Sequence, residues 1–256
     1  MKDVIRKRLK DENAPMADEN ADKVPTFVVA TKGTRAESPP TLFRSYQCED
    51  HDASECTIWE AGRATSAAPT FFKPVQIGRG VFIDGGLAHN NPGELALFEA
   101  QKIWRTAQRF CLVSIGTGRL TSIQVVAPDS GSSVAAETSK KWKLLDLLPG
   151  TTTAKKIGNV PKGLSILTSM GEVCIQLSTS SEQVHHRLLE RSRDLTLAQR
   201  LLYHRLNVDR GLEDIKLNEH ERINEIDMHT AAYLDERTDL KNACIQDLMN
   251  PIANER

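Results

Sequence analysis

Short apolar runs mark the strands that the chain is expected to form. Residues 26–31, 81–83 and 110–115 are nearly continuous runs of β-forming side chains. Such runs are typical of strands that are covered on both faces of a sheet. Residues 42–46 alternate between apolar and polar positions and predict a further strand, and residues 203–208 resemble a strand as well. The pattern therefore predicts several short strands spread over the chain.

Helical signals lie between these runs. Thr57 and Glu60 have the spacing of a capping box, which predicts a helix that begins at Thr57, runs toward Ala68 and is stopped by Pro69. Asn91 followed by Pro92 predicts an N-cap and a first-turn proline. Further helices are expected at residues 1–10, 140–148 and 164–192 and from residue 218 onward.

Strands that alternate with helical segments predict an α/β layered domain with a mostly parallel sheet. We expect residues 1–24 to form a helical stub and a loop, and residues 25–250 to form one domain with flanking helices.

Composition excludes several classes of function. Lys and Arg total 33 against 34 Asp and Glu, so no bulk positive charge favours nucleic acid. No stretch approaches the ~20 apolar residues of a membrane span, and the N-terminus lacks the apolar core of a signal peptide. The five scattered cysteines include no CxxC pair, which argues against a zinc ribbon, a redox motif and a disulfide framework. We expect a cytoplasmic protein that binds no nucleic acid, metal or cofactor.

Asp84 is the leading candidate for chemistry. It follows the predicted strand at residues 81–83, and ligands of open α/β sheets gather at the carboxyl ends of strands. Gly85 and Gly86 leave room for backbone or a ligand to approach. A carboxylate there can act as a general base toward a hydroxyl. The same Asp-Gly-Gly string is also ordinary turn chemistry, so spacing alone leaves both interpretations open.

Four ordered blocks resemble a known family. Residues 63–72, 82–87, 90–92 and 112–118 together are similar to the second half of a patatin-like phospholipase domain, and residues 203–212 are similar to its end region. The resemblance implies a serine acyl hydrolase that acts on lipid esters through a Ser–Asp dyad. Asp84 would be its acid, with Gly85 and Gly86 in support. The implied partners are a lipid ester substrate or a membrane surface, and peripheral association with membranes follows from them.

One departure from the family pattern is plain. No two of the 15 glycines are four residues apart, so the Gly-x-Ser-x-Gly nucleophile turn does not occur in this sequence. Ser66 has alanine flanks of similar spacing but lies inside the predicted helix that begins at Thr57, and we do not expect it to be the nucleophile. We expect a partial patatin-like fold whose N-terminal strands are missing and which is inactive alone. The alternatives are a non-catalytic remnant that binds lipid or protein, and a reading frame truncated at its start.

Two further motifs carry weaker signals. Gly116-Thr117-Gly118 after a strand resembles a phosphate-binding turn, but it lacks the third glycine or the Lys-Ser/Thr ending that such turns need. His185 and His186 have no spacing to carboxylates or cysteines that predicts a metal site, so we expect a surface pair on a helix.

Overall fold

The structure is a computed structural model that describes residues 1–17, 24–33, 39–48, 51–68, 71–118, 170–194, 200–213, 215 and 219–249. The chain divides into two compact units. The first comprises Met1–His89 with Gln124–Cys174, and the second comprises Asn90–Ile123 with Ile175–Arg256. The helix expected at residues 140–148 lies outside the described residues.

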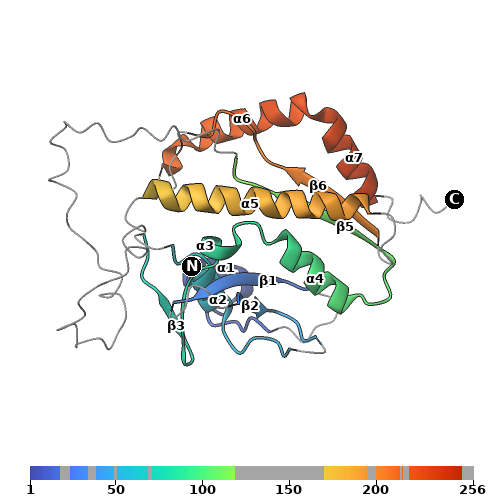
Figure 1. Cartoon of the computed structure of the whole chain (residues 1–256). Coiled ribbons are helices and arrows are strands. Elements are labelled where there is room, and N and C mark those ends of the chain that lie inside the picture. The colour runs from blue at the N-terminus through green and yellow to red at the C-terminus, as the bar shows by residue number, and fades with distance from the viewer. Residues whose placement is uncertain are drawn as a thin grey trace, which may run out of the picture. The chain divides into compact units, whose positions relative to one another are not determined.

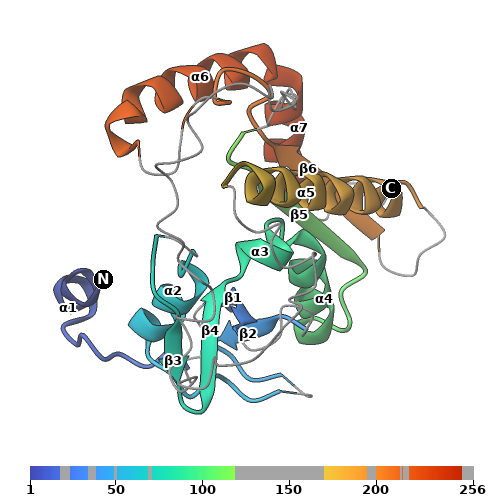
Figure 2. The same cartoon turned by 60° about the vertical axis from the view of Figure 1, so that its left-hand side comes forward.

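The first unit, which contains the N-terminal end of the chain (Figure 1), is built on a four-stranded sheet with the strand order β2-β1-β4-β3 (Figure 2). Its elements are α1 (Lys2–Leu9), β1 (Phe27–Lys32), β2 (Thr41–Arg44), α2 (Ile58–Thr65), β3 (Val75–Ile77), β4 (Gly80–Asp84) and α3 (Gly86–His89). The strands expected at residues 26–31, 42–46 and 81–83 are confirmed within one or two residues as β1, β2 and β4.

The expected mostly parallel sheet is wrong for this unit, because all three strand pairs of the four-stranded sheet are antiparallel. Figure 2 shows the hairpin formed by β3 and β4. Only two residues join these strands, and so short a connection permits only antiparallel pairing. Gly78 in this turn has a φ of 55°, which favours glycine. An apolar run predicts a strand but carries no information on the direction of its partner.

The sheet and α2 share the core of the first unit. The capping box is confirmed: Thr57 accepts a hydrogen bond from the Glu60 N–H, and the Glu60 side chain accepts one from the Thr57 N–H. Phe43 and Phe82 meet edge to face with ring centroids 5.1 Å apart. Seven buried side chains form this cluster: Met16, Ala30, Phe43, Cys56, Ala61, Ala64 and Phe82. The helix thus begins where the sequence predicts and buries its alanine face on the sheet.

The second unit pairs two parallel strands. Its elements are α4 (Gly93–Ile103), β5 (Arg109–Ile115), α5 (Met170–Arg193) from Ile175 onward, β6 (Arg200–Leu206), a 3-10 turn (His220–Arg222), α6 (Ile223–Glu236) and α7 (Thr238–Met249). Here the parallel expectation holds, with β5 and β6 aligned from Arg109↔Arg200 to Ile115↔Leu206. Leu188 of α5 packs with Leu97 of α4 and Leu201 of β6 in the core.

The predicted N-cap of α4 is wrong by one residue. The helix begins at Gly93 with Pro92 as its N-cap. The Asn91 side chain still serves this end of the helix, because its Oδ1 accepts a hydrogen bond from the Gly93 N–H at 3.1 Å. The Asn91 side chain therefore stabilises the turn that leads into α4 and is not the N-cap of the helix.

Candidate active site

Asp84 is the last residue of β4 and lies beside the C-terminal end of α2. It pairs in register with Ala30 of β1, and its backbone N–H donates to the Ala67 carbonyl at 3.1 Å. Two strands and a helix end therefore fix its backbone. The sequence prediction that Asp84 ends a strand is confirmed, although the neighbouring strand is antiparallel.

The Asp84 carboxylate is half-buried and held from one side. Among the described residues it accepts one hydrogen bond, from the Gly86 N–H to Oδ1 at 2.7 Å. Burial raises the pKa of Asp84 above its ordinary value, and the hydrogen bond from Gly86 offsets part of that rise. A carboxyl group with a raised pKa is a better proton acceptor than an exposed one, because it holds a proton more strongly.

The raised pKa of Asp84 predicts a pH-dependent difference in stability. The folded state binds the proton more tightly than the unfolded state, so this group's contribution to stability falls as pH rises from the unfolded pKa, near 3.8, through the folded pKa. Asp84→Asn keeps the Oδ1 acceptor but cannot ionise. We expect the free energy of unfolding of the variant to rise relative to wild type between about pH 4 and about pH 7. Urea denaturation of both proteins at these two pH values measures the difference, and a constant difference would contradict the direction of the pKa shift.

Gly85 has no room for a side chain. A Cβ built on it would lie 2.2 Å from the Val29 carbonyl oxygen and 2.6 Å from the Val29 carbonyl carbon of β1. The glycine thus permits the chain after Asp84 to pass close to β1, which is the approach of other backbone that the sequence left open beside that of a ligand. Gly86 supports the carboxylate directly through its N–H.

The position of Ser66 does not fit the role of nucleophile. It caps the C-terminal end of α2, and its exposed hydroxyl donates to the Gly62 carbonyl at 2.9 Å. Its proton is therefore directed into its own helix and not to Asp84. The neighbouring Thr65 hydroxyl is also engaged, because it donates to the Val29 carbonyl at 2.6 Å.

The two weaker motifs have structural roles. The Gly118 N–H donates to Asn207 Oδ1 at 2.8 Å, so this amide of the strand-end turn is not directed at a phosphate. His185 Nδ1 lies 3.1 Å from the Tyr203 hydroxyl in the second unit. Over the part of the chain that the structure describes, no group of three His, Cys, Asp or Glu residues is arranged to hold a metal ion.

A polar network in the second unit was not predicted. The Arg205 guanidinium donates to Ser114 Oγ at 2.7 Å and to Ser181 Oγ at 3.0 Å. Asn91 Nδ2 donates to the Ser181 carbonyl at 3.2 Å. Ser114 and Arg205 are register partners on β5 and β6, so the network ties α5 and the start of α4 to the ends of both strands. The only sequence signal was Asn91, because the other residues are far apart in the chain.

Residues 1–97 match the family described as patatin-like phospholipase. The match contains Asp84, Gly85 and Gly86 and ends before the fourth of the four blocks quoted above. In the described residues, no helix combines the length and apolarity needed to cross a membrane.

Curated relatives agree with this family match. Calcium-independent phospholipase A2-gamma of Rattus norvegicus is 34% identical over 143 residues, which cover 53% of this chain and 18% of that protein. Phospholipase A I of Arabidopsis thaliana is 28% identical over 152 residues, 45% of this chain and 12% of that protein. Patatin-like protein 2 of Arabidopsis thaliana is 30% identical over 127 residues, 41% of this chain and 31% of that protein. The chain thus spans less than a third of the length of each relative, and the resemblance to this family is confirmed.

Proposed function

From the patatin-like phospholipase domain that residues 1–97 carry, we propose that this chain supplies the acid of a serine–aspartate dyad that hydrolyses lipid esters. The acid is Asp84. The substrate class follows from two of the relatives above, which are named as phospholipases. The reaction takes place at a lipid surface, with the protein bound peripherally on the cytoplasmic side.

One observation carries the proposal: the carboxylate of Asp84 is half-buried, has a raised pKa and is fixed by the Gly86 N–H inside the family-matched segment. A turn residue with no further role needs none of this, because an exposed aspartate satisfies a Gly-Gly turn equally well. Buried carboxyl groups with raised pKa values are enriched at catalytic sites.

The chemistry requires a hydroxyl within about 2.6–3.2 Å of the carboxylate. Asp84 takes the serine proton while the serine oxygen attacks the ester carbonyl, and the alcohol leaves as an acyl-enzyme forms. Water then attacks the acyl-enzyme, and the fatty acid is released. Glycine N–H groups stabilise the oxyanion in such reactions. This sequence holds no Gly-x-Ser-x-Gly turn, so the nucleophile and the oxyanion glycines come from a further segment, and the chain alone is inactive.

A fusion tests this proposal. A segment that carries a glycine-rich loop and a Gly-x-Ser-x-Gly turn is joined ahead of Met1, and hydrolysis of phospholipid and acylglycerol esters is followed. We expect residues 1–256 alone to show no turnover of short-chain nitrophenyl esters above background, and the fusion to release fatty acid. A folded but inert fusion would reject the hydrolase assignment and favour a remnant that binds lipid or protein without catalysis.

A further inference from the structure

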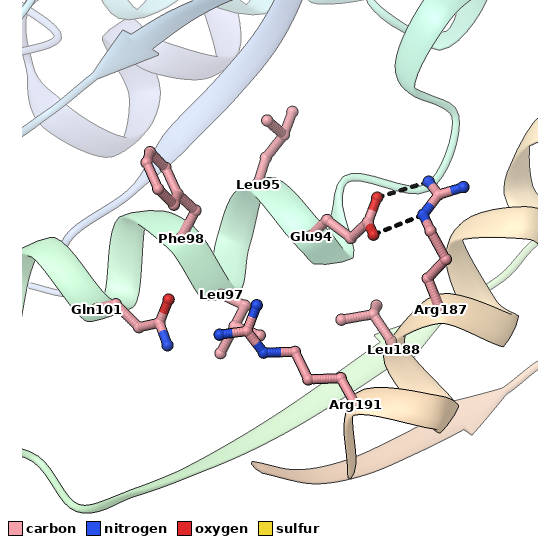
Figure 3. A pocket seen from close by; sticks show the side chains of 8 residues that line it. All are labelled: Glu94, Leu95, Leu97, Phe98, Gln101, Arg187, Leu188 and Arg191. Atoms are coloured by element: carbon pink, nitrogen blue, oxygen red, sulfur yellow. Dashed lines mark hydrogen bonds and ion pairs between the residues drawn. The ribbon is translucent and has the colours of Figure 1, made fainter. Parts of the chain in front are cut away.

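An open pocket of about 300 Å³ lies between α4 and α5 of the second unit (Figure 3). The described side chains that line it come from these two helices, and none belongs to the first unit, which contains Asp84. Leu97 and Leu188 are 4% and 1% exposed and join the pocket to the core of the unit. Leu95 and the largely exposed Phe98 extend this apolar lining to the surface.

The charges at the pocket do not cancel. Arg187 donates from Nε and Nη2 to the two carboxylate oxygens of Glu94 at 2.7 and 2.6 Å, so these two side chains neutralise each other. Arg191 also lines the pocket, and Figure 3 shows its side chain extending from α5 toward Leu97 of α4. Its guanidinium makes no hydrogen bond or ion pair with another described residue. Among the described residues that line the pocket, the positive charge of Arg191 therefore remains beside the apolar side chains.

We propose that this pocket binds the anion of a fatty acid. The carboxylate lies on the Arg191 guanidinium, whose planar fork matches carboxylate geometry. The acyl chain lies along Leu97, Phe98 and Leu188 and is removed from water there. A volume of about 300 Å³ is at the lower end for ligand sites, so part of a long chain is buried and the rest stays at the surface.

Other ligand classes fit the charges less well. A neutral acyl lipid leaves the Arg191 charge unused. Among the described residues that line the pocket, only Arg191 is an unpaired cation, so a phosphate dianion would keep one negative charge without a partner. The inference does not rest on the proposed hydrolysis, because it uses residues of the second unit only.

Calorimetric titration of the full chain with dodecanoate, below the concentration at which it forms micelles, tests the proposal. We expect saturable binding that Arg191→Gln weakens at least about tenfold, because hydrogen bonds to charged groups contribute strongly. Phe98→Asp, which places a negative charge beside the acyl chain, should weaken it as well. Arg193→Gln alters an exposed arginine on the same helix that does not line the pocket, and should leave binding unchanged. Circular dichroism melts verify that each variant is folded.

Several outcomes would overturn the proposal. The proposal is rejected if wild type does not bind dodecanoate, or if folded Arg191→Gln binds it equally well. Equal binding of dodecanol or tighter binding of dodecyl phosphate would also reject it. So would sedimentation measurements that show a second copy of the chain bound at the pocket. Asp84→Asn should leave dodecanoate binding intact. Failure of the hydrolase assignment is therefore distinguishable from failure of this site.

Discussion

Asp84→Asn should lower the hydrolysis rate of the active fusion by roughly 100- to 10,000-fold, the range that a general base contributes. Asparagine keeps the shape of the side chain and can still accept the Gly86 N–H, but it cannot take a proton from a serine hydroxyl. The substitution should therefore lower kcat and leave the fold intact. Initial rates on a phospholipid substrate, measured with a thermal melt of the same sample, check both parts.

Two matched variants make this rate loss interpretable. Asp52→Asn changes an exposed aspartate of the same unit and should leave the rate unchanged. Ser66→Ala should also leave it unchanged, because the Ser66 hydroxyl donates to the Gly62 carbonyl. If Asp84→Asn retains the wild-type rate, Asp84 is not the base. If folded Ser66→Ala abolishes turnover, Ser66 is the nucleophile after all.

Gly85→Ala should destabilise the first unit by about 3 kcal/mol or more, at the upper end of the range for overpacking substitutions. The added Cβ would lie 2.2 Å from a backbone oxygen of β1, and a backbone atom in a paired strand cannot rotate away as a side chain can. Either β1 and β4 separate or the turn after Asp84 moves. Urea denaturation followed by circular dichroism measures the loss.

Gly33→Ala is the control for this effect. A Cβ at Gly33 would meet Val81 at 3.5 Å, which is ordinary van der Waals contact. We expect its free energy of unfolding to lie within about 1 kcal/mol of wild type, since glycine to alanine at a compatible position changes stability little. Equal stability of Gly85→Ala and Gly33→Ala would show that the close approach to Val29 does not constrain Gly85.

Patterns within a few neighbouring residues predict a helix or strand well when such a pattern by itself defines the element. The Thr57 and Glu60 capping box, the strand that ends at Asp84 and the strand at β5 were all predicted from residues within one turn or one run. The β3 strand was missed because Val75–Ile77 is only three residues long and is interrupted by Gln76, unlike the continuous apolar run at residues 81–83. The start of α4 was shifted by one residue because Asn91 makes a turn to Gly93 instead of the cap.

By itself the sequence determined the position of the candidate acid and the absence of a Gly-x-Ser-x-Gly turn, because each depends only on residues close together in the chain. It also determined the family resemblance, because that depends on the order of short blocks along the chain. The tertiary structure decided the rest. Strand direction depends on which edges pair, the need for glycine at position 85 depends on the backbone of Val29, and the free charge of Arg191 depends on Glu94 pairing with Arg187. These are contacts between residues separated by tens of positions, and hydrophobic periodicity carries no record of them.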